Sequence, residues 1–332
     1  EAAWKAIDPI ETFKRQLLDT QVIDAQGIAA VEKRVADRNA RAARRAVAAA
    51  DPAPEDVLTF MYTDSKCETV PAEFAKVNLV GSLPEIKRVN GELTYKDALK
   101  EALVQEMLRD QRVVFYGEDV ADYGGAFKVT KGLLEAFGRD RIFNTPISEA
   151  CICGTACGAA MNGLRPVVEL MYFDFALMAA DQISNQAAKW HYMSGAQTEV
   201  PLVIRASAGA GKGYGGQHSQ TLESLFCHIP GLYIVYPATP CDAKGLLKAA
   251  IRDNNPVLFV ESQALYGMKG SVPEGDYLVP LGVAAVKREG TDITFVAWGP
   301  LVHDCLKAAD QLKAERGVSA EVIDLRSLVP LD

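Results

Sequence analysis

Short apolar runs alternate with stretches of helical period through most of the chain. The apolar runs are at 112–117, 141–144, 166–171, 200–206, 232–237 and 256–261, and the helical patterns lie near 130–137, 150–162, 174–194 and 241–253. Apolar strands separated by helices are typical of a parallel sheet that is covered on both faces. The pattern therefore predicts an α/β fold with a doubly wound parallel sheet.

The pattern differs at the two ends of the chain. Residues 1–62 read as helix throughout, with Asp8-Pro9 opening one helix and Asp24 capping the next. Residues 63–90 have no sustained period and are expected to be a linker. Thr94 and Asp97 form a capping box that predicts a helix running to Asp110. We expect the central α/β domain to cover 91–268.

A Gly- and Pro-rich connection follows at 266–281. Beyond it the periods predict one strand at 293–298, a helix at 301–315 and a second strand at 320–325. A single βαβ unit is too small to hold a core of its own. We therefore expect 281–332 to be the beginning of a second α/β domain that is cut short.

Composition and charge exclude several classes of function. The net charge of the 332 residues is −8, which lacks the basic footprint of a nucleic-acid-binding protein. The arginines at 38, 41, 44 and 45 are interpreted as a solvated helix face. No apolar stretch approaches the ~18 residues of a membrane span. Seven unevenly spaced cysteines favour reduced thiols in a cytoplasm-like compartment. The sequence opens at Glu1 rather than Met, so it does not decide whether a targeting segment precedes it.

Three polar segments follow predicted strands, where ligands of parallel sheets bind. They contain Glu118 and Asp119, Glu149, and His218. Glu149 is followed by a helix of small residues, which leaves room for a flat ligand beside the sheet. A carboxylate at a strand end is also commonly a helix cap, so residue type alone leaves both interpretations of Glu149 open. Phe175 follows another strand and is either core or a surface on which a cofactor ring stacks.

Two apparent motifs are rejected. Cys151, Cys153 and Cys157 have no second cluster of ligands at a suitable spacing, which favours buried structural thiols over a metal site. The glycine-rich segment 209–213 imitates a phosphate-binding P-loop. It lacks the first glycine and the Ser or Thr that should follow the lysine.

Six segments together resemble the beta subunit of the thiamine-diphosphate-dependent E1 component of 2-oxo acid dehydrogenase complexes. They are Tyr116–Val120, Thr145–Glu149, Gly163–Pro166, Asp181–Ile183, Gln217–Gln220 and Arg252–Pro256. The resemblance runs from about Leu93 to Asp332. Residues 1–62 resemble the C-terminal tail of the alpha subunit of the same enzyme. The chain therefore resembles part of a fused alpha-beta E1 polypeptide.

The resemblance implies roles for individual residues. Glu149 matches the glutamate that hydrogen-bonds a pyrimidine nitrogen and favours the imino tautomer of the cofactor. Phe175, Met171 and Ile147 match residues at the pyrimidine, and His218 matches a histidine that faces the substrate and the acyl group. The resemblance further implies a potassium site, largely of backbone carbonyls, at Leu202, Ala250, Ile251, Asp253 and Asn255.

The same family holds the diphosphate and Mg²⁺ through a Gly-Asp-Gly…Asn motif of the alpha subunit, and this sequence has no such motif. We therefore expect Mg²⁺ to bind through an alpha-type domain, and this fragment to be inactive by itself. The transketolase-type C-terminal domain of the family is expected to be represented only by its first part.

The implied activity is oxidative decarboxylation of a 2-oxo acid, pyruvate or a branched-chain acid, with acyl transfer to the lipoamide of E2. The alternatives are an acetoin dehydrogenase beta-type subunit and an assembly fragment without turnover. The implied partners are an E1 alpha-type region or subunit, an E2 lipoyl acyltransferase and a second copy, in a dimer or a heterotetramer-like assembly. The expected compartment is the cytoplasm, or the mitochondrial matrix in a eukaryote.

Overall fold

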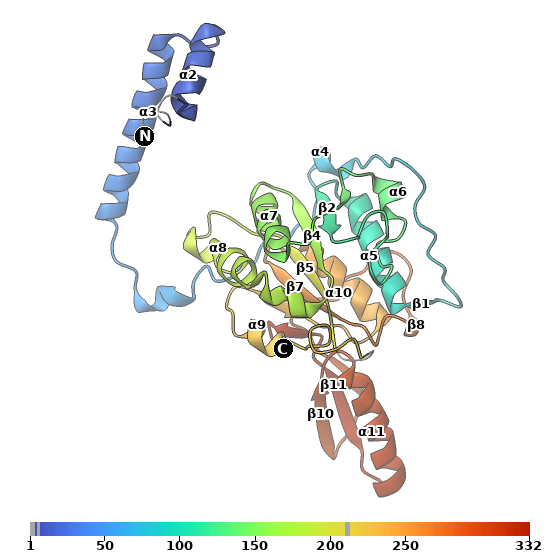
Figure 1. The fold of residues 1–332 in the computed structure, drawn as a ribbon. Helices are drawn as coiled ribbons and strands as arrows, with labels where there is room; N and C mark the ends of the chain where they lie inside the picture. Colours follow the sequence, from blue (N-terminus) through green and yellow to red (C-terminus); the bar gives the residue numbers. More distant parts are fainter. Residues whose placement is uncertain (1–3, 5–6, 210–212) are drawn as a thin grey trace. The chain divides into compact units, whose positions relative to one another are not determined.

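The computed structural model describes Trp4, residues 7–209 and residues 213–332, which form two compact units, Glu1–Leu58 and Thr59–Asp332 (Figure 1). The first unit contains α2 (Pro9–Asp19), α3 (Ala25–Ala48) and a 3₁₀ turn, η1 (Pro54–Leu58). Both helices begin at the predicted caps. Asp8 accepts from the amide of Ile10 at 2.8 Å, and Asp24 accepts from that of Gly27 at 2.7 Å. Neither helix has a buried residue.

Residues 63–90, which we expected to be a linker, contain a single helical turn, α4 (Ala72–Ala75). The segment is nevertheless bonded to the second unit. The amide of Thr63 donates to Oδ1 of Asn255 at 2.9 Å, and the amide of Cys67 donates to the carbonyl of Arg252 at 2.7 Å. Thr63 and Cys67 are therefore bonded to residues at the C-terminal end of one helix of the α/β body of the second unit.

The body is built on a seven-stranded sheet with the order β12-β6-β7-β5-β4-β2-β3. All neighbouring strands pair in parallel except β12, which is antiparallel to β6. The predicted doubly wound parallel sheet is thus confirmed. The strands are β2 (Val113–Gly117), β3 (Ile142–Asn144), β4 (Arg165–Leu170), β5 (Val203–Ala208), β6 (Tyr233–Val235), β7 (Val257–Ser262) and β12 (Ser327–Val329).

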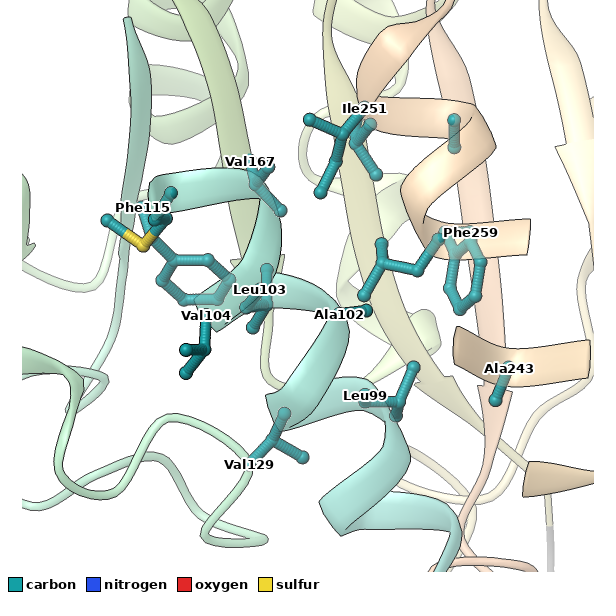
Figure 2. Close-up of a cluster of buried hydrophobic side chains, with 14 of the residues drawn as sticks. Leu99, Ala102, Leu103, Val104, Phe115, Val129, Val167, Ala243, Ile251 and Phe259 are labelled. Atoms are coloured by element: carbon teal, nitrogen blue, oxygen red, sulfur yellow. The ribbon is translucent and has the colours of Figure 1, made fainter. Parts of the chain in front are cut away.

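Two hydrophobic cores cover the two faces of this sheet. On one face, α5 (Tyr95–Arg109) and α10 (Pro240–Arg252) pack on Phe115 and Phe259, as Figure 2 shows. Helix α6 (Leu133–Phe137) belongs to the same core. On the other face, α7 (Glu149–Met161) and the segment after β4 pack on Val114 and Tyr116. Successive residues of one strand therefore point into different cores, which explains why the strands are apolar without interruption.

The prediction of one continuous helix near 174–194 is wrong. The segment consists of a 3₁₀ turn, η2 (Phe173–Leu177), a π-helical stretch, η3 (Gln182–Ala187), and a short helix, α8 (Trp190–Met193). Its apolar residues follow a helical spacing because Phe173, Ala176 and Ile183 all reach the same core. Periodicity identifies that buried face but does not distinguish one continuous helix from several short turns.

The C-terminal part contains more than the single βαβ unit we predicted. A three-stranded sheet has the order β10-β11-β9, with β9 (Ala285–Arg288) antiparallel to β11 (Ala320–Asp324) and β10 (Ile293–Ala297) parallel to it. Helix α11 (Leu301–Arg316) links the parallel pair (Figure 1). The chain then returns to the large sheet as β12, so this part shares a strand with the body. Three elements remain, α9 (Glu223–Cys227), β1 (Glu92–Thr94) and β8 (Lys269–Ser271), the last two forming an antiparallel pair.

A charged cluster also joins this part to the body. Asp242, at the start of α10, is 2% exposed and contacts Lys287 of β9 at 2.6 Å and Arg326, just before β12, at 2.7 Å. Lys287 also reaches Asp324 of β11 at 3.5 Å. Two basic and two acidic side chains thus neutralise one another at this junction.

Candidate active site

A cavity of about 780 Å³ lies at the carboxyl ends of the parallel strands. Glu118 follows β2, Glu149 begins α7 after β3, and Met171 follows β4. The ends of β2 and β3 are two of the three strand ends at which the sequence predicted chemistry. The cavity is lined by Glu118, Asp119, Thr145, Ile147, Glu149, Met171, Asp174, Phe175, Leu177, Met178, Gln217 and Gln220.

Glu149 is 8% exposed and occupies the first turn of α7. Within the described parts of the chain, its carboxylate forms no hydrogen bond or ion pair. A helix N-terminus favours a negative charge, which compensates in part for this burial. The small residues of α7 bring the helix close to its neighbours, and a Cβ on Gly154 would lie 2.9 Å from Oε1 of Gln182. The carboxylate is thus buried, and its hydrogen-bonding capacity is left for a ligand.

A second carboxylate lies close to the first. Burial raises the pKa of Glu118, and the negative charges of Glu149 and Asp119 raise it further. The strand that precedes it is tightly packed, because a Cβ on Gly117 would lie 2.6 Å from the carbonyl oxygen of Glu169. This side of the cavity therefore carries several acidic groups and resists further negative charge.

Aromatic rings connect His218 with this cavity, although His218 is not among the residues that line it. The ring of Tyr172 meets that of His218 edge to face at 4.6 Å, and the ring of Phe175 meets it at 5.2 Å. Phe175 itself lines the cavity. His218 is half-buried, in the loop that follows β5. The structure thus brings His218 to Phe175 across 43 positions of the sequence, because β4 and β5 are neighbours.

The rim of the cavity is apolar and open. Ile147 is 81% exposed, Met178 is 69% exposed and Leu177 is 46% exposed. All three line the cavity. Leu177, Met178 and Asp174 were not singled out from the sequence, because their apolar and acidic residue types are ordinary beside a core helix. Exposed apolar groups at the mouth of a cavity are typical of a binding surface.

The five residues of the predicted potassium site lie around the end of α10 and the start of β7. The guanidinium of Arg165 donates to the carbonyls of Ile251 at 2.8 Å and Asp253 at 2.5 Å. Oδ1 of Asp253 accepts from the amide of Asn255 at 2.9 Å, and the carbonyl of Leu202 accepts from Val257 at 2.8 Å. Each carbonyl oxygen keeps a second lone pair. A cation bound here would share its ligands with Arg165.

No group of three or more His, Cys, Asp or Glu side chains that could hold a metal ion occurs among the described residues. Burial raises the pKa of the Cys153 thiol, and it raises that of Cys157 to about 12, which suits packing residues rather than ligands. The glycine-rich segment 209–213 lies partly outside the described residues. None of the helices in the described ranges is long and apolar enough to cross a membrane.

Comparisons with known proteins agree with this architecture. The family model for the transketolase pyrimidine-binding domain matches residues 91–269, and that for the transketolase C-terminal domain matches residues 282–332. A solved structure described as a split-gene transketolase, an inactive beta4 tetramer, has a TM-score of 0.59 and 26% identity, covering 72% of this chain and 73% of that one. Transketolase from Leishmania mexicana has a TM-score of 0.56 at 15% identity, covering 73% of this chain and 36% of its own, and shows the fold alone.

The curated relatives are more specific. The beta subunit of acetoin:2,6-dichlorophenolindophenol oxidoreductase from Cupriavidus necator is 51% identical over 73% of this chain and 74% of its own length. The beta subunit of 2-oxoisovalerate dehydrogenase from Bacillus subtilis is 49% identical over 72% of this chain and 73% of its own. The beta subunit of the pyruvate dehydrogenase E1 component from Rhizobium meliloti is 48% identical over 72% and 52%.

These matches place the strands, the cavity and Glu149 inside a domain of known type. The family is that of thiamine-diphosphate-dependent enzymes, and the close relatives are E1-type beta subunits of pyruvate, branched-chain and acetoin dehydrogenases. The chain therefore belongs to the transketolase-type family of pyrimidine-binding domains, in the branch that contains the beta subunits of 2-oxo acid dehydrogenase E1 components.

Proposed function

We propose that this chain supplies the pyrimidine-binding half of the active site of a thiamine-diphosphate-dependent 2-oxo acid dehydrogenase E1 component. The observation that carries the proposal is Glu149. It is a buried carboxylate with no partner in the described chain, and it lines the same cavity as Phe175. The ring of Phe175 in turn contacts the ring of His218. The reaction is oxidative decarboxylation of pyruvate or a branched-chain 2-oxo acid, with the lipoyl group of an E2 acyltransferase as acceptor.

Each side chain has a distinct task in this proposal. When bound, thiamine diphosphate supplies a carbon nucleophile that adds to the 2-oxo group and allows carbon dioxide to leave. Glu149 hydrogen-bonds a pyrimidine nitrogen, the contact that places its carboxyl group for acid-base work on the ring. Phe175 and Met171 hold the ring, and Ile147 lies at its open side. His218 donates a hydrogen bond where charge develops on the substrate.

We further propose that an E1 alpha-type domain covers the open rim and holds the diphosphate with Mg²⁺. The apolar rim residues Ile147, Leu177 and Met178 support this, since a docked partner would remove them from water. The acidic lining of this half makes it a poor site for a diphosphate. Self-association into a dimer or a heterotetramer-like assembly belongs to the same proposal. The compartment is the cytoplasm in a bacterium or the mitochondrial matrix in a eukaryote.

Residues 1–62 are proposed to be the tail of such an alpha-type region, fused to the beta-type part. Helices α2 and α3 have no buried residue. Phe13 is 58% exposed and Ile10 is 65% exposed. Amphipathic helices without a core of their own need a larger body on which to pack.

Potassium remains a proposal at the five residues around the end of α10. Asp253 and Asn255 are 2% and 3% exposed, and Asn255 ties residue 63 to this turn. If the ion binds, KCl should raise the melting temperature more than an equal concentration of NaCl. The Asn255→Ala variant should lose that difference. Identical melting curves in the two salts would remove potassium from the proposal.

The direct test is an assay of the complete enzyme, with alpha-type part, Mg²⁺ and cofactor, on pyruvate, branched-chain 2-oxo acids and acetoin. We expect turnover of one 2-oxo acid class. Acetoin is the second candidate because an acetoin oxidoreductase beta subunit is 51% identical to the chain. Activity on none of these substrates would rule out both candidates. Decarboxylation by residues 1–332 alone would contradict the proposal that this chain holds only half of the active site. It would equally contradict the alternative that the chain is an assembly fragment without turnover.

A further inference from the structure

Asp174 is a buried acid that lines the cavity, and the reaction proposed above gives it no role. It is 5% exposed and lies between Phe173 and Phe175 in the 3₁₀ turn after β4. Its Oδ1 accepts from the amide of Ser219 at 3.3 Å, from the amide of Gln220 at 3.2 Å and from Nε2 of Gln220 at 2.8 Å. Its Oδ2 is buried and has no partner among the described residues.

The three donors belong to the loop that carries His218. Three other described bonds tie this loop: the amide of Gly209 donates to the carbonyl of Gln220 at 3.3 Å, that of His218 to the carbonyl of Gly215 at 3.4 Å, and Nε2 of Gln263 to the carbonyl of His218 at 3.4 Å. All three are longer than the 2.8 Å bond from Nε2 of Gln220 to Asp174. A carboxylate also binds N–H donors more strongly than a neutral carbonyl does. Asp174 is therefore the strongest described anchor of the residues that directly follow His218.

The same short segment also fixes the imidazole. Tyr172 and Phe175, two positions before and one after Asp174, pack edge to face against the His218 ring at 4.6 and 5.2 Å. Residues 172–175 thus hold both the backbone of the loop and the ring of His218. A displacement of about 1 Å at a reacting group can cost about 100-fold in rate.

We propose that Asp174 is the positioning residue for His218. It accepts the loop amides and thereby holds the imidazole against Tyr172 and Phe175, beside the cavity. The inference rests on the proposed function for its kinetic consequence, while its structural part concerns this chain alone. Asn at this position keeps one acceptor oxygen, whereas Ala removes both.

The structural part is tested by carbethoxylation of the purified chain with diethyl pyrocarbonate, followed by mass spectrometry of each histidine. We expect His218 to react at least about threefold faster in Asp174→Ala than in the parent, because the loop opens more often once its anchor is removed. Asp174→Asn should remain close to the parent. His191 and His303, which bond backbone carbonyls elsewhere, report any general unfolding. Asp122→Ala is the matched control, since Asp122 contacts Arg139 and Asn144 instead.

The kinetic part uses the complete enzyme in a double-mutant cycle. We expect Asp174→Ala to lower kcat by about 10- to 100-fold, with little further loss when it is added to His218→Ala, because no imidazole is left to position. Additive losses, or unchanged reactivity of His218 in Asp174→Ala, would overturn the inference. Full activity of His218→Ala would instead remove the role of His218 from the proposed function. The two failures are therefore distinguishable.

Discussion

Glu149 is a buried carboxylate whose removal should cost activity and little stability. Replacing Glu149 with Gln in the complete enzyme keeps the shape but removes the exchangeable proton. We expect kcat to fall by about 100-fold or more, the range of a lost general acid-base group. The melting temperature should hold, because no described hydrogen bond or ion pair is broken. Activity and melting curves of the same preparation check both statements, and near-normal turnover would falsify the cofactor assignment.

At the scale of residues, the sequence located part of the cavity and missed the rest for a physical reason. Met171 directly follows β4, and Glu149 and Phe175 lie in the segments just after β3 and β4, so the rule that ligands bind at strand ends finds them. The link between Asp174 and Gln220 spans 46 positions and depends on how two loops fold over the sheet edge. Such a contact leaves no local pattern, and Asp174 appears in the sequence only as an acid among aromatic residues.

At the scale of elements, buried strands were predictable because both of their faces are apolar. The strands β2, β4 and β7 lie within two residues of the predicted runs. The elements that were missed lack that signal. The pairing of β1 with β8 uses Lys269, Gly270 and Ser271, which are exposed or half-buried and follow no apolar period. Backbone pairing defines β8, and composition does not report it.

The end of β2 provides a test of element packing. Gly117→Ala should destabilise the chain by about 1–3 kcal/mol, because the new methyl would meet the backbone carbonyl of Glu169, which cannot rotate away. Gly158→Ala is the matched control. Its Cβ has no atom within 4 Å in the described structure, so a helix-interior alanine should be neutral or stabilise by up to about 1 kcal/mol. Urea unfolding of both variants measures the difference, and equal effects would contradict this account of the packing.

At the scale of the whole molecule, the junction around Asp242 and Asp324 predicts a pH effect. Burial raises the pKa of Asp324, and the nearby Lys287 only partly opposes it. The folded chain therefore holds this proton more tightly than the unfolded chain. Stability from this group is present at low pH and is lost as pH rises from the ordinary Asp value of about 3.9 through the raised one.

Asp324→Asn cannot ionise and should escape that loss. The difference in unfolding free energy between Asp324→Asn and the parent should thus shift in favour of the variant as pH rises through this range. Urea unfolding at a series of pH values measures it. A difference for Asp324→Asn that does not change with pH would show that this carboxyl titrates alike in both states.

The return of the chain as β12 has a consequence for how the molecule comes apart. Residues 327–329 pair with β6 and cover the edge of the large sheet, although they follow the small sheet in the sequence. Unfolding of the small sheet would detach this strand and expose β6, so the two sheets should unfold together in one calorimetric peak. A protein truncated before residue 282 would have β6 as an unpaired edge strand, with which another chain could pair. The truncated protein should therefore aggregate under conditions in which the longer one remains in solution.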